Sequence, residues 1–256
     1  MRLLYAELLK IRTAPRTTLG LVLGLLLLVG AGSAATASSA DTSPFGFGDA
    51  SRDVIEVTSV AAIFTLILGI LVVTWEYRHG TITPTYLVTP KREQVIGAKL
   101  VAALLAGGVL TATAVVVALV VATFWISLEL GEGHWELIGR NVLGAALWGA
   151  LGAGLGALMQ SQVGAIVTSF VWFLVAEPLL GVTLELLTDS SVGDYFPGSV
   201  LERLQDSGAS VETGEGEVLT GSDYPYGPWA AAALAFAYTA AMAVLGLASA
   251  VRRDVP

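Results

Sequence analysis

EVTSVAAIFTLILGILVVTW, at residues 56–75, is an apolar run whose one charged residue stands at its first position. A helix of about 20 residues crosses the roughly 30 Å of hydrocarbon in a bilayer. Backbone groups in lipid must be hydrogen-bonded within their own segment, so this run is expected to be a transmembrane helix. EYRHGTITPTYLVTPKREQVIGAK, at residues 76–99, follows directly and is too polar to lie in lipid.

Similar apolar runs lie on both sides of this pair, and composition agrees with them. Hydrophobic residues make up 55% of the 256 residues and charged residues only 13%, against about 25% charged residues in soluble domains. The mean hydropathy is +0.75. We expect an all-α membrane protein with a single transmembrane domain over residues 1–256 and no soluble domain. The expected spans are residues 17–37, 56–75, 99–126, 141–159, 163–187 and 229–251.

The basic residues predict the orientation of these spans. With the N-terminus inside, ten of the 13 Lys and Arg residues fall on the cytoplasmic side, and only Arg52, Arg140 and Arg203 fall outside. This bias is the positive-inside rule, and it predicts cytoplasmic N- and C-termini in a cell membrane. The ten inner residues are Arg2, Lys10, Arg12, Arg16, Arg78, Lys91, Arg92, Lys99, Arg252 and Arg253.

Acidic residues have the opposite distribution, with sixteen of 21 on the outer side, many of them in an expected outer loop at residues 188–228. A solvated acidic surface and a cation-attracting vestibule are both consistent with this excess. Within the loop, Ser199 is a candidate cap for a short helix that ends near Gln205. Residues 208–223 are rich in Gly, Ser, Thr and acidic residues and are expected to be mobile.

Residues 1–16 predict an amphipathic helix that lies in the membrane interface. Leu4, Leu8 and Ile11 recur at helical spacing, and charged residues occupy other positions of the wheel. A second interpretation treats this stretch as topogenic charge alone. A third treats the first span and residues 32–40 as a cleavable secretory signal, but the long apolar run favours an uncleaved span.

The polar stretch after the second span is punctuated by Gly80 and by two Thr-Pro steps. Threonine caps free N–H groups and proline fits the first turn of a helix. We therefore expect a short helix near residues 84–88, and a second helix that starts at Pro90 and runs into the third span. Such a helix suits docking to a cytoplasmic partner, and an ordinary structured loop is the alternative.

Several kinds of chemistry are absent from the sequence. No phosphate-binding loop is present, so the chain is not expected to hydrolyse ATP itself or to act as an enzyme. It contains no cysteine, and its two histidines, His79 in the inner loop and His134 in an expected outer turn, have no metal-binding partner histidine nearby. No cofactor, metal or nucleic acid is expected. Gly152 and Gly156, four residues apart, predict a close helix-packing face.

Glu177 is the one acidic residue expected well inside a span, and Pro178 follows it. An acid at such depth usually faces the interior of a helix bundle, and proline can kink a helix. The pair is a candidate lining of a transport path or a hinge. The alternative places Glu177 nearer the outer interface or pairs it with a polar neighbour.

With these features together, the chain resembles the ABC type 2 transporter permeases of bacteria. In that family, the loop after span two carries an acid, then Gly-Thr, then a Thr/Ser-Pro step with basic residues, then a lysine that opens span three. The likeness covers the whole chain in topology and about 25 residues in motif. The matching residues are Glu76, Gly80, Thr81, Thr89, Pro90, Lys91, Arg92 and Lys99.

The resemblance implies a membrane subunit of an exporter that pairs with a separate ATPase, which binds the ATP. It also implies a complex of two permeases, identical or homologous, and two ATPases. The loop would then dock the ATPase as a coupling helix. The alternatives are an ion-coupled secondary transporter or channel that uses Glu177, and a membrane scaffold without transport. The candidate docking residues are Glu76, Arg78, Gly80, Thr81, Thr83, Tyr86, Thr89, Lys91 and Arg92.

Overall fold

The fold was analysed in a computed structural model of the whole chain. The structure describes residues 2–13, 16–39, 49–89, 91–188, 190–206, 210–212, 218–220 and 224–252. Pro90, at which a helix that runs into the third span was expected to start, lies outside the described residues. So does most of the stretch 208–223 that was expected to be mobile.

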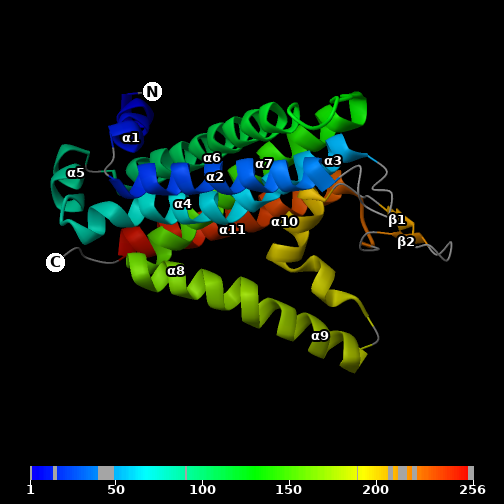
Figure 1. Cartoon of the computed structure of the whole chain (residues 1–256). Helices are drawn as coiled ribbons and strands as arrows, with labels where there is room; N and C mark the ends of the chain where they lie inside the picture. Colours follow the sequence, from blue (N-terminus) through cyan, green and yellow to red (C-terminus); the bar gives the residue numbers. More distant parts are fainter. Residues whose placement is uncertain are drawn as a thin grey trace.

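Six helices of the described chain are long and apolar enough to cross a membrane, which confirms the six predicted spans. They pack as a bundle, and two of them are interrupted or extended by short helical segments. Figure 1 shows the bundle from the side. The spanning helices are α2 (Arg16–Ser39), α3–η1–α4 (Ala50–Glu56, Val57–Val60, Ala61–Arg78), α6 (Arg92–Ala122), α7 (Glu132–Met159), α8–η2–α9 (Gln162–Val171, Trp172–Ala176, Glu177–Thr188) and α11 (Pro228–Arg252).

Shorter elements occupy the two ends of the bundle. At one end lie α1 (Arg2–Thr13), α5 (Ile82–Val88) and the end of α11 (Figure 1). We refer to this as the α5 end. At the opposite end lie α3 and an antiparallel hairpin of β1 (Ser210–Glu212) and β2 (Val218–Thr220).

Two spans begin earlier than expected, because polar residues were assigned to connections. The third span starts at Arg92 and not at Lys99, which lies two turns inside α6 with no exposed surface. The fourth starts at Glu132, so the prediction that His134 lies in an outer turn is wrong. His134 is buried in the first turn of α7, where its ring Nδ1 accepts a hydrogen bond from the Gly131 N–H at 3.0 Å.

The centre of the bundle is α7, which contacts α4, α6 and α11. Gly152 and Gly156 both lie against α4, and Gly156 is next to Ile70. A Cβ at Gly152 would overlap the carbonyl oxygen of Leu66, so the two backbones touch where a side chain would hold them apart. Such close approach by small residues is a frequent mode of packing between membrane helices.

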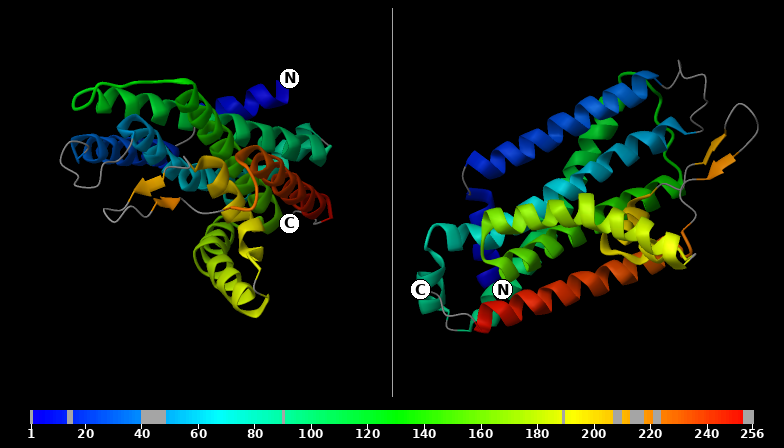
Figure 2. Two further views of the ribbon diagram at one scale, coloured as in Figure 1. Left: turned by 90° about the vertical axis from the view of Figure 1, so that its right-hand side faces the viewer. Right: turned by 90° about the horizontal axis from the view of Figure 1, so that it is seen from below.

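The helix α8–η2–α9 stands away from the rest of the bundle. α8 contacts α4 and α7 near its start, and α9 then diverges (Figure 2). The five residues of η2 form a π-helix, a widened turn that shifts the register of the helix at this point. We refer to this helix, residues 162–188, as the arm. Only Ala165, Ser169 and Glu177 are buried in it.

After the arm, the chain returns to the bundle through η3 (Val192–Tyr195) and α10 (Pro197–Gln205). α10 packs against α7 and α11 and buries Val200, Leu201 and Leu204 without exposed surface. The predicted helix up to Gln205 is confirmed, but the prediction that Ser199 caps it is wrong. The N-cap is Phe196, because Pro197 takes the first helical position and already places Ser199 inside the helix.

The close contact of α7 with α4 predicts different effects for two glycines of α7. In Gly152→Ala, the new methyl group meets the Leu66 carbonyl, and overpacking of this kind lowers the free energy of unfolding by about 1–3 kcal/mol or more. In Gly139→Ala, the methyl group enters open space, and the better helix propensity raises stability by up to about 1 kcal/mol. Thermal unfolding of both variants in detergent measures the difference. Equal stability of the two would contradict this description of the interface.

Candidate functional site

The connection between α4 and α6 folds as a turn followed by α5. α4 ends at Arg78, and Gly80 adopts a positive φ of 67°, a conformation that suits glycine and reverses the chain. Thr81 then precedes Ile82–Val88, so the short helix begins two residues before the expected residue 84. Pro84 is the third residue of this helix, where a missing N–H is tolerated.

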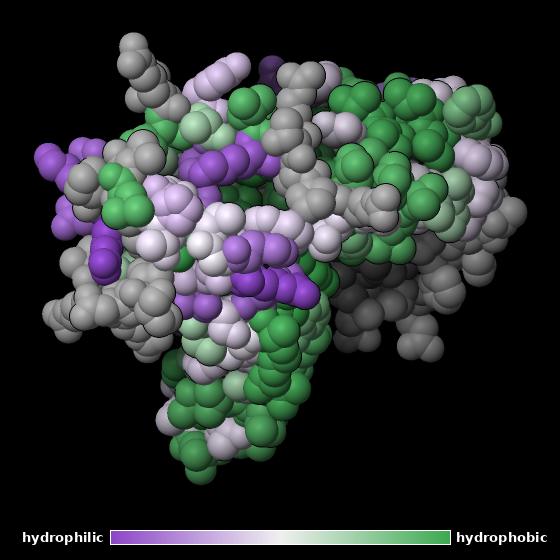
Figure 3. Space-filling view, turned by 90° about the vertical axis from the view of Figure 1, so that its left-hand side faces the viewer, coloured by the Kyte–Doolittle hydropathy of each residue, from purple (hydrophilic) through white to green (hydrophobic). Residues whose placement is uncertain are grey.

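The residues predicted to dock a partner divide into exposed and buried groups. Thr89 and Arg92 are half-buried, Glu76 is buried, and Tyr86 lies within α5. Figure 3 looks onto this end of the molecule, where hydrophilic residues gather across the middle of the face and hydrophobic residues cover the projecting helix below. The exposed members are Arg78, Gly80, Thr81, Thr83 and Lys91.

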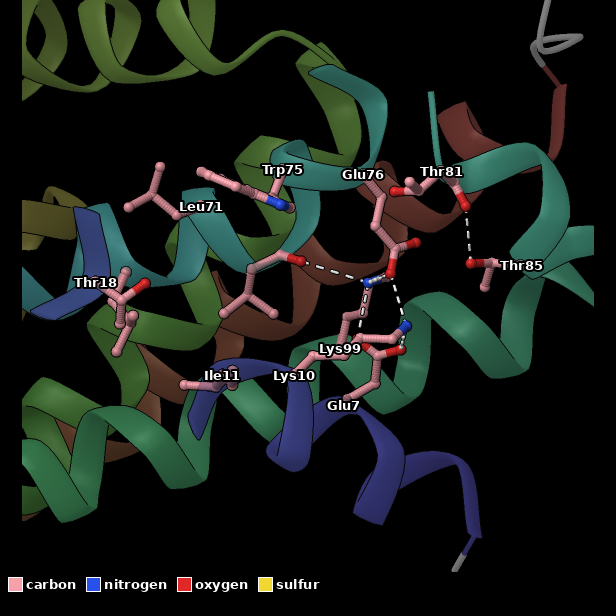
Figure 4. A pocket seen from close by; sticks show the side chains of 12 residues that line it. Glu7, Lys10, Ile11, Thr18, Leu71, Trp75, Glu76, Thr81, Thr85 and Lys99 are labelled. Carbon is pink, nitrogen blue, oxygen red and sulfur yellow. Dashed lines mark hydrogen bonds and ion pairs between the residues drawn. The ribbon is translucent and has the colours of Figure 1, made fainter. Parts of the chain in front are cut away.

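Below this face lies a cluster of four charged side chains from three different helices. Glu7 and Lys10 belong to α1, Glu76 to α4 and Lys99 to α6 (Figure 4). Glu7 is 2%, Glu76 5% and Lys99 0% exposed. Two carboxylates and two ammonium groups balance each other, so the cluster carries no net formal charge.

Lys99 has an acceptor for each of its three ammonium protons. Its Nζ lies 2.8 Å from Glu7 Oε2, 2.9 Å from Glu76 Oε1 and 3.4 Å from the carbonyl oxygen of Val72. A lysine without exposed surface is costly unless its charge is paired and its donors are used. The surroundings of Lys99 meet both conditions.

Lys10 closes the cluster on its exposed side. Its Nζ donates to Glu7 Oε1 at 2.6 Å and to Glu76 Oε1 at 2.7 Å, while its side chain stays 48% exposed. Burial lowers the pKa of Lys10, but the hydrogen bonds and charges of Glu7 and Glu76 outweigh it, so the pKa is raised above its ordinary value. Lys10 therefore stays protonated across the physiological pH range.

Glu7 links the N-terminal helix to the bundle, because its two oxygens accept from different lysines. α1 packs along α6, with Glu7 turned towards the bundle and Tyr5 70% exposed on another side. From the sequence, Glu7 is one of the charged residues expected away from the apolar face of an interfacial helix. The structure places it at the contact with the bundle.

Two further contacts connect the ends of the α4–α6 connection to other helices. The Arg78 guanidinium donates to the side-chain oxygen of Gln162, the first residue of α8, at 3.0 Å. The Arg92 guanidinium donates to the carbonyl oxygen of Ala250 in α11 at 3.5 Å. A displacement of α5 would therefore act on α1, α8 and α11 as well as on α4 and α6.

Glu177, the other predicted site residue, lies elsewhere in the molecule. It follows η2 directly, is 5% exposed, and its Oε1 accepts the backbone N–H of Ser199 at 2.9 Å. A Cβ at residue 198 would lie 2.6 Å from Glu177 Oε1, so Gly198 gives the carboxylate room to approach. Glu177 thus caps the first turn of α10 from the arm, while Pro178 is exposed.

Sequence reasoning missed the pairing of Glu7 with Lys99, which are 92 positions apart. The available signal was a lysine two turns into an apolar helix, since such a charge requires a buried partner. Among the described residues, no group of three or more His, Cys, Asp or Glu is placed to hold a metal ion.

Comparison with known proteins gives no family for this chain. No protein-family model matches it. No curated protein matches its sequence.

The first prediction from this site concerns the buried ammonium. Lys99→Met leaves the carboxylates of Glu7 and Glu76 with one lysine between them, and breaking a buried pair in this way costs about 3–5 kcal/mol of unfolding free energy. The control is Lys91→Met, an exposed lysine just before α6, which should change stability by less than about 0.5 kcal/mol. Denaturant unfolding in detergent compares the two, and similar midpoints would show that the cluster adds no stability.

The second prediction concerns the cap of α10. Glu177→Ala removes the acceptor of the Ser199 N–H, and loss of a cap costs about 0.5–2 kcal/mol, so amides of α10 should exchange up to about thirtyfold faster. Glu185→Ala removes an exposed acid from the same arm and should leave α10 unchanged. Hydrogen–deuterium exchange on peptides from residues 197–205 decides, and unchanged exchange in Glu177→Ala would contradict the capping role.

Proposed function

We propose that this chain is the membrane-spanning permease subunit of an ATP-binding-cassette exporter in a bacterial cell membrane. A separate ATPase subunit would bind and hydrolyse the ATP. The observation that carries the proposal is α5, a short helix at one end of the bundle that connects α4 with α6, beside the buried charge cluster that links those two helices to α1.

The exposed surface of α5 supports its use as a docking element. Leu87 is 78% exposed and Thr83 is exposed, and basic residues stand on both sides of the helix at Arg78 and Lys91. An exposed apolar side chain with cationic neighbours suits insertion into a groove of a partner protein. Docking to a cytoplasmic ATPase requires the α5 end to face the cytoplasm, and the distribution of Lys and Arg predicts the same orientation.

The internal contacts support a mechanical role for this helix. A force on α5 would reach the end of α4, where the Thr81 N–H donates to the carbonyl oxygen of Glu76 and the Glu76 side chain is paired with Lys10 and Lys99. It would also reach the Arg78–Gln162 bond at the start of the arm. Close-packed interiors move as units and pass displacement on. Closure of two ATPases on ATP would therefore move the arm relative to the bundle and switch the side to which the substrate path opens.

The arm also supports the pairing of two permease chains. Large apolar residues are exposed around η2 and along both flanking helices. Most of the surface of the arm is therefore not covered by its own bundle. The arm diverges from its own bundle (Figure 2). Lipid alone can cover such a surface, and in the complex proposed here a second copy of this chain packs against it. The complex proposed here contains two permeases and two ATPases.

Replacement of one side chain on α5 tests the docking proposal. Leu87→Glu should weaken co-purification with the proposed ATPase subunit by about tenfold or more, since buried interface anchors contribute about 2 kcal/mol or more. Phe124→Glu is the matched control, because Phe124 is also 78% exposed and lies just beyond the other end of α6. Pull-down after co-expression, with membrane insertion checked for both variants, measures the effect.

Two results would count against this function. Retained ATPase binding in Leu87→Glu would show that α5 is not the docking element. Transport by this chain alone in liposomes, with a pH dependence lost in Glu177→Gln, would favour the ion-coupled transporter instead. Glu177 is the buried acid that such a mechanism would use.

A further inference from the structure

A cavity of about 400 Å³ lies beside the charge cluster. One face of α4 forms its wall, with Leu68, Leu71, Val72, Trp75 and Glu76 at successive positions of helical spacing. These positions cover about 12 Å along the helix axis. The volume falls within the range of small-molecule sites.

The lining changes from apolar to polar along the length of the cavity. Leu71, Thr18 and Ile11 lie at one side of the view in Figure 4, and Thr81 and Thr85 lie at the other, with the cluster between them. The polar side belongs to the start of α5, and α4 ends just beyond it at Arg78. A cavity of this form fits an amphipathic molecule whose polar part lies at the membrane boundary.

Glu76 lines this cavity and has an unused acceptor. Its Oε1 accepts from both lysines, but its Oε2 is buried and accepts no hydrogen bond from any residue that the structure describes. The side chain is 7% exposed. A buried carboxylate oxygen without a donor is unfavourable, so a donor from a bound molecule would be strongly preferred there.

We propose that this cavity binds the headgroup of an ethanolamine phospholipid from the adjacent leaflet. The primary ammonium donates to Glu76 Oε2, and the phosphate lies near the Lys10 ammonium at the exposed rim. The upper part of an acyl chain follows the apolar face of α4. The site requires only the chain in a membrane and does not depend on an ATPase partner.

The charge pattern selects this headgroup over other phospholipids. A choline headgroup has the same charge but no N–H group, so it leaves Glu76 Oε2 without a donor. An anionic headgroup without an amine brings a net negative charge towards that oxygen. A zwitterionic headgroup with donor protons meets both requirements, and Trp75 at the cavity wall is typical of a residue at headgroup level.

Lipid binding to the purified full-length chain tests the proposal directly. Native mass spectrometry in detergent, with phosphatidylethanolamine or phosphatidylcholine added, should show about tenfold tighter binding of the ethanolamine lipid. One charge-assisted hydrogen bond contributes enough free energy for such a ratio. Glu76→Gln should remove the preference. Equal binding of the two lipids to the unaltered chain would overturn the proposal.

A second pair of variants avoids any change to the charge cluster. Thr18 lines the cavity and its neighbour Thr17 does not, so Thr18→Trp should fill the site and lower ethanolamine-lipid binding about tenfold, while Thr17→Trp stays within about twofold. Unaltered binding in Thr18→Trp would place the lipid elsewhere. Soluble glycerophosphoethanolamine should not displace the lipid, and full displacement by it would show a site for a water-soluble amine instead.

Discussion

The buried ammonium of Lys99 is the constraint on which the α5 end of this molecule depends. Its charge is tolerable among apolar helices only because two carboxylates and a backbone carbonyl surround it. Those carboxylates belong to α1 and α4, so the chain cannot bury Lys99 without bringing three helices together. Because α5 connects the end of α4 to the start of α6, the contacts that hold these two helices together also hold the two ends of α5.

The molecule divides into a tightly packed part and a loosely attached one. Where α7 meets α4, glycines bring the two backbones into contact, and little sliding is possible without a clash. The arm of α8 and α9 has few buried residues and is held at its start by Gln162, near the α5 end, and at the beginning of α9 by Glu177, which caps α10. A movement that begins at α5 would therefore displace the arm more easily than the centre of the bundle.

Much of this architecture follows from the sequence alone, for identifiable reasons. Apolar runs of membrane-spanning length identify the six spans, and Thr-Pro steps and Gly80 indicate a short helix close to its place in the structure. The partner of Lys99 could not be predicted, because local periodicity does not relate residues 92 positions apart. The cap of α10 by Glu177 was missed for the same reason, and a local serine was assigned to that role.

The contact between Glu7 and Lys99 also orders events during synthesis. Membrane helices are inserted from the N-terminal side as the chain grows. Glu7 can meet its buried lysine only after about ninety further residues have been made. Until then α1 remains at the membrane surface, beside the two spans that precede α6, without the buried partner of Glu7. Its docking requires that the third span is in place, so α1 is made before α6 but reaches its final position after α6.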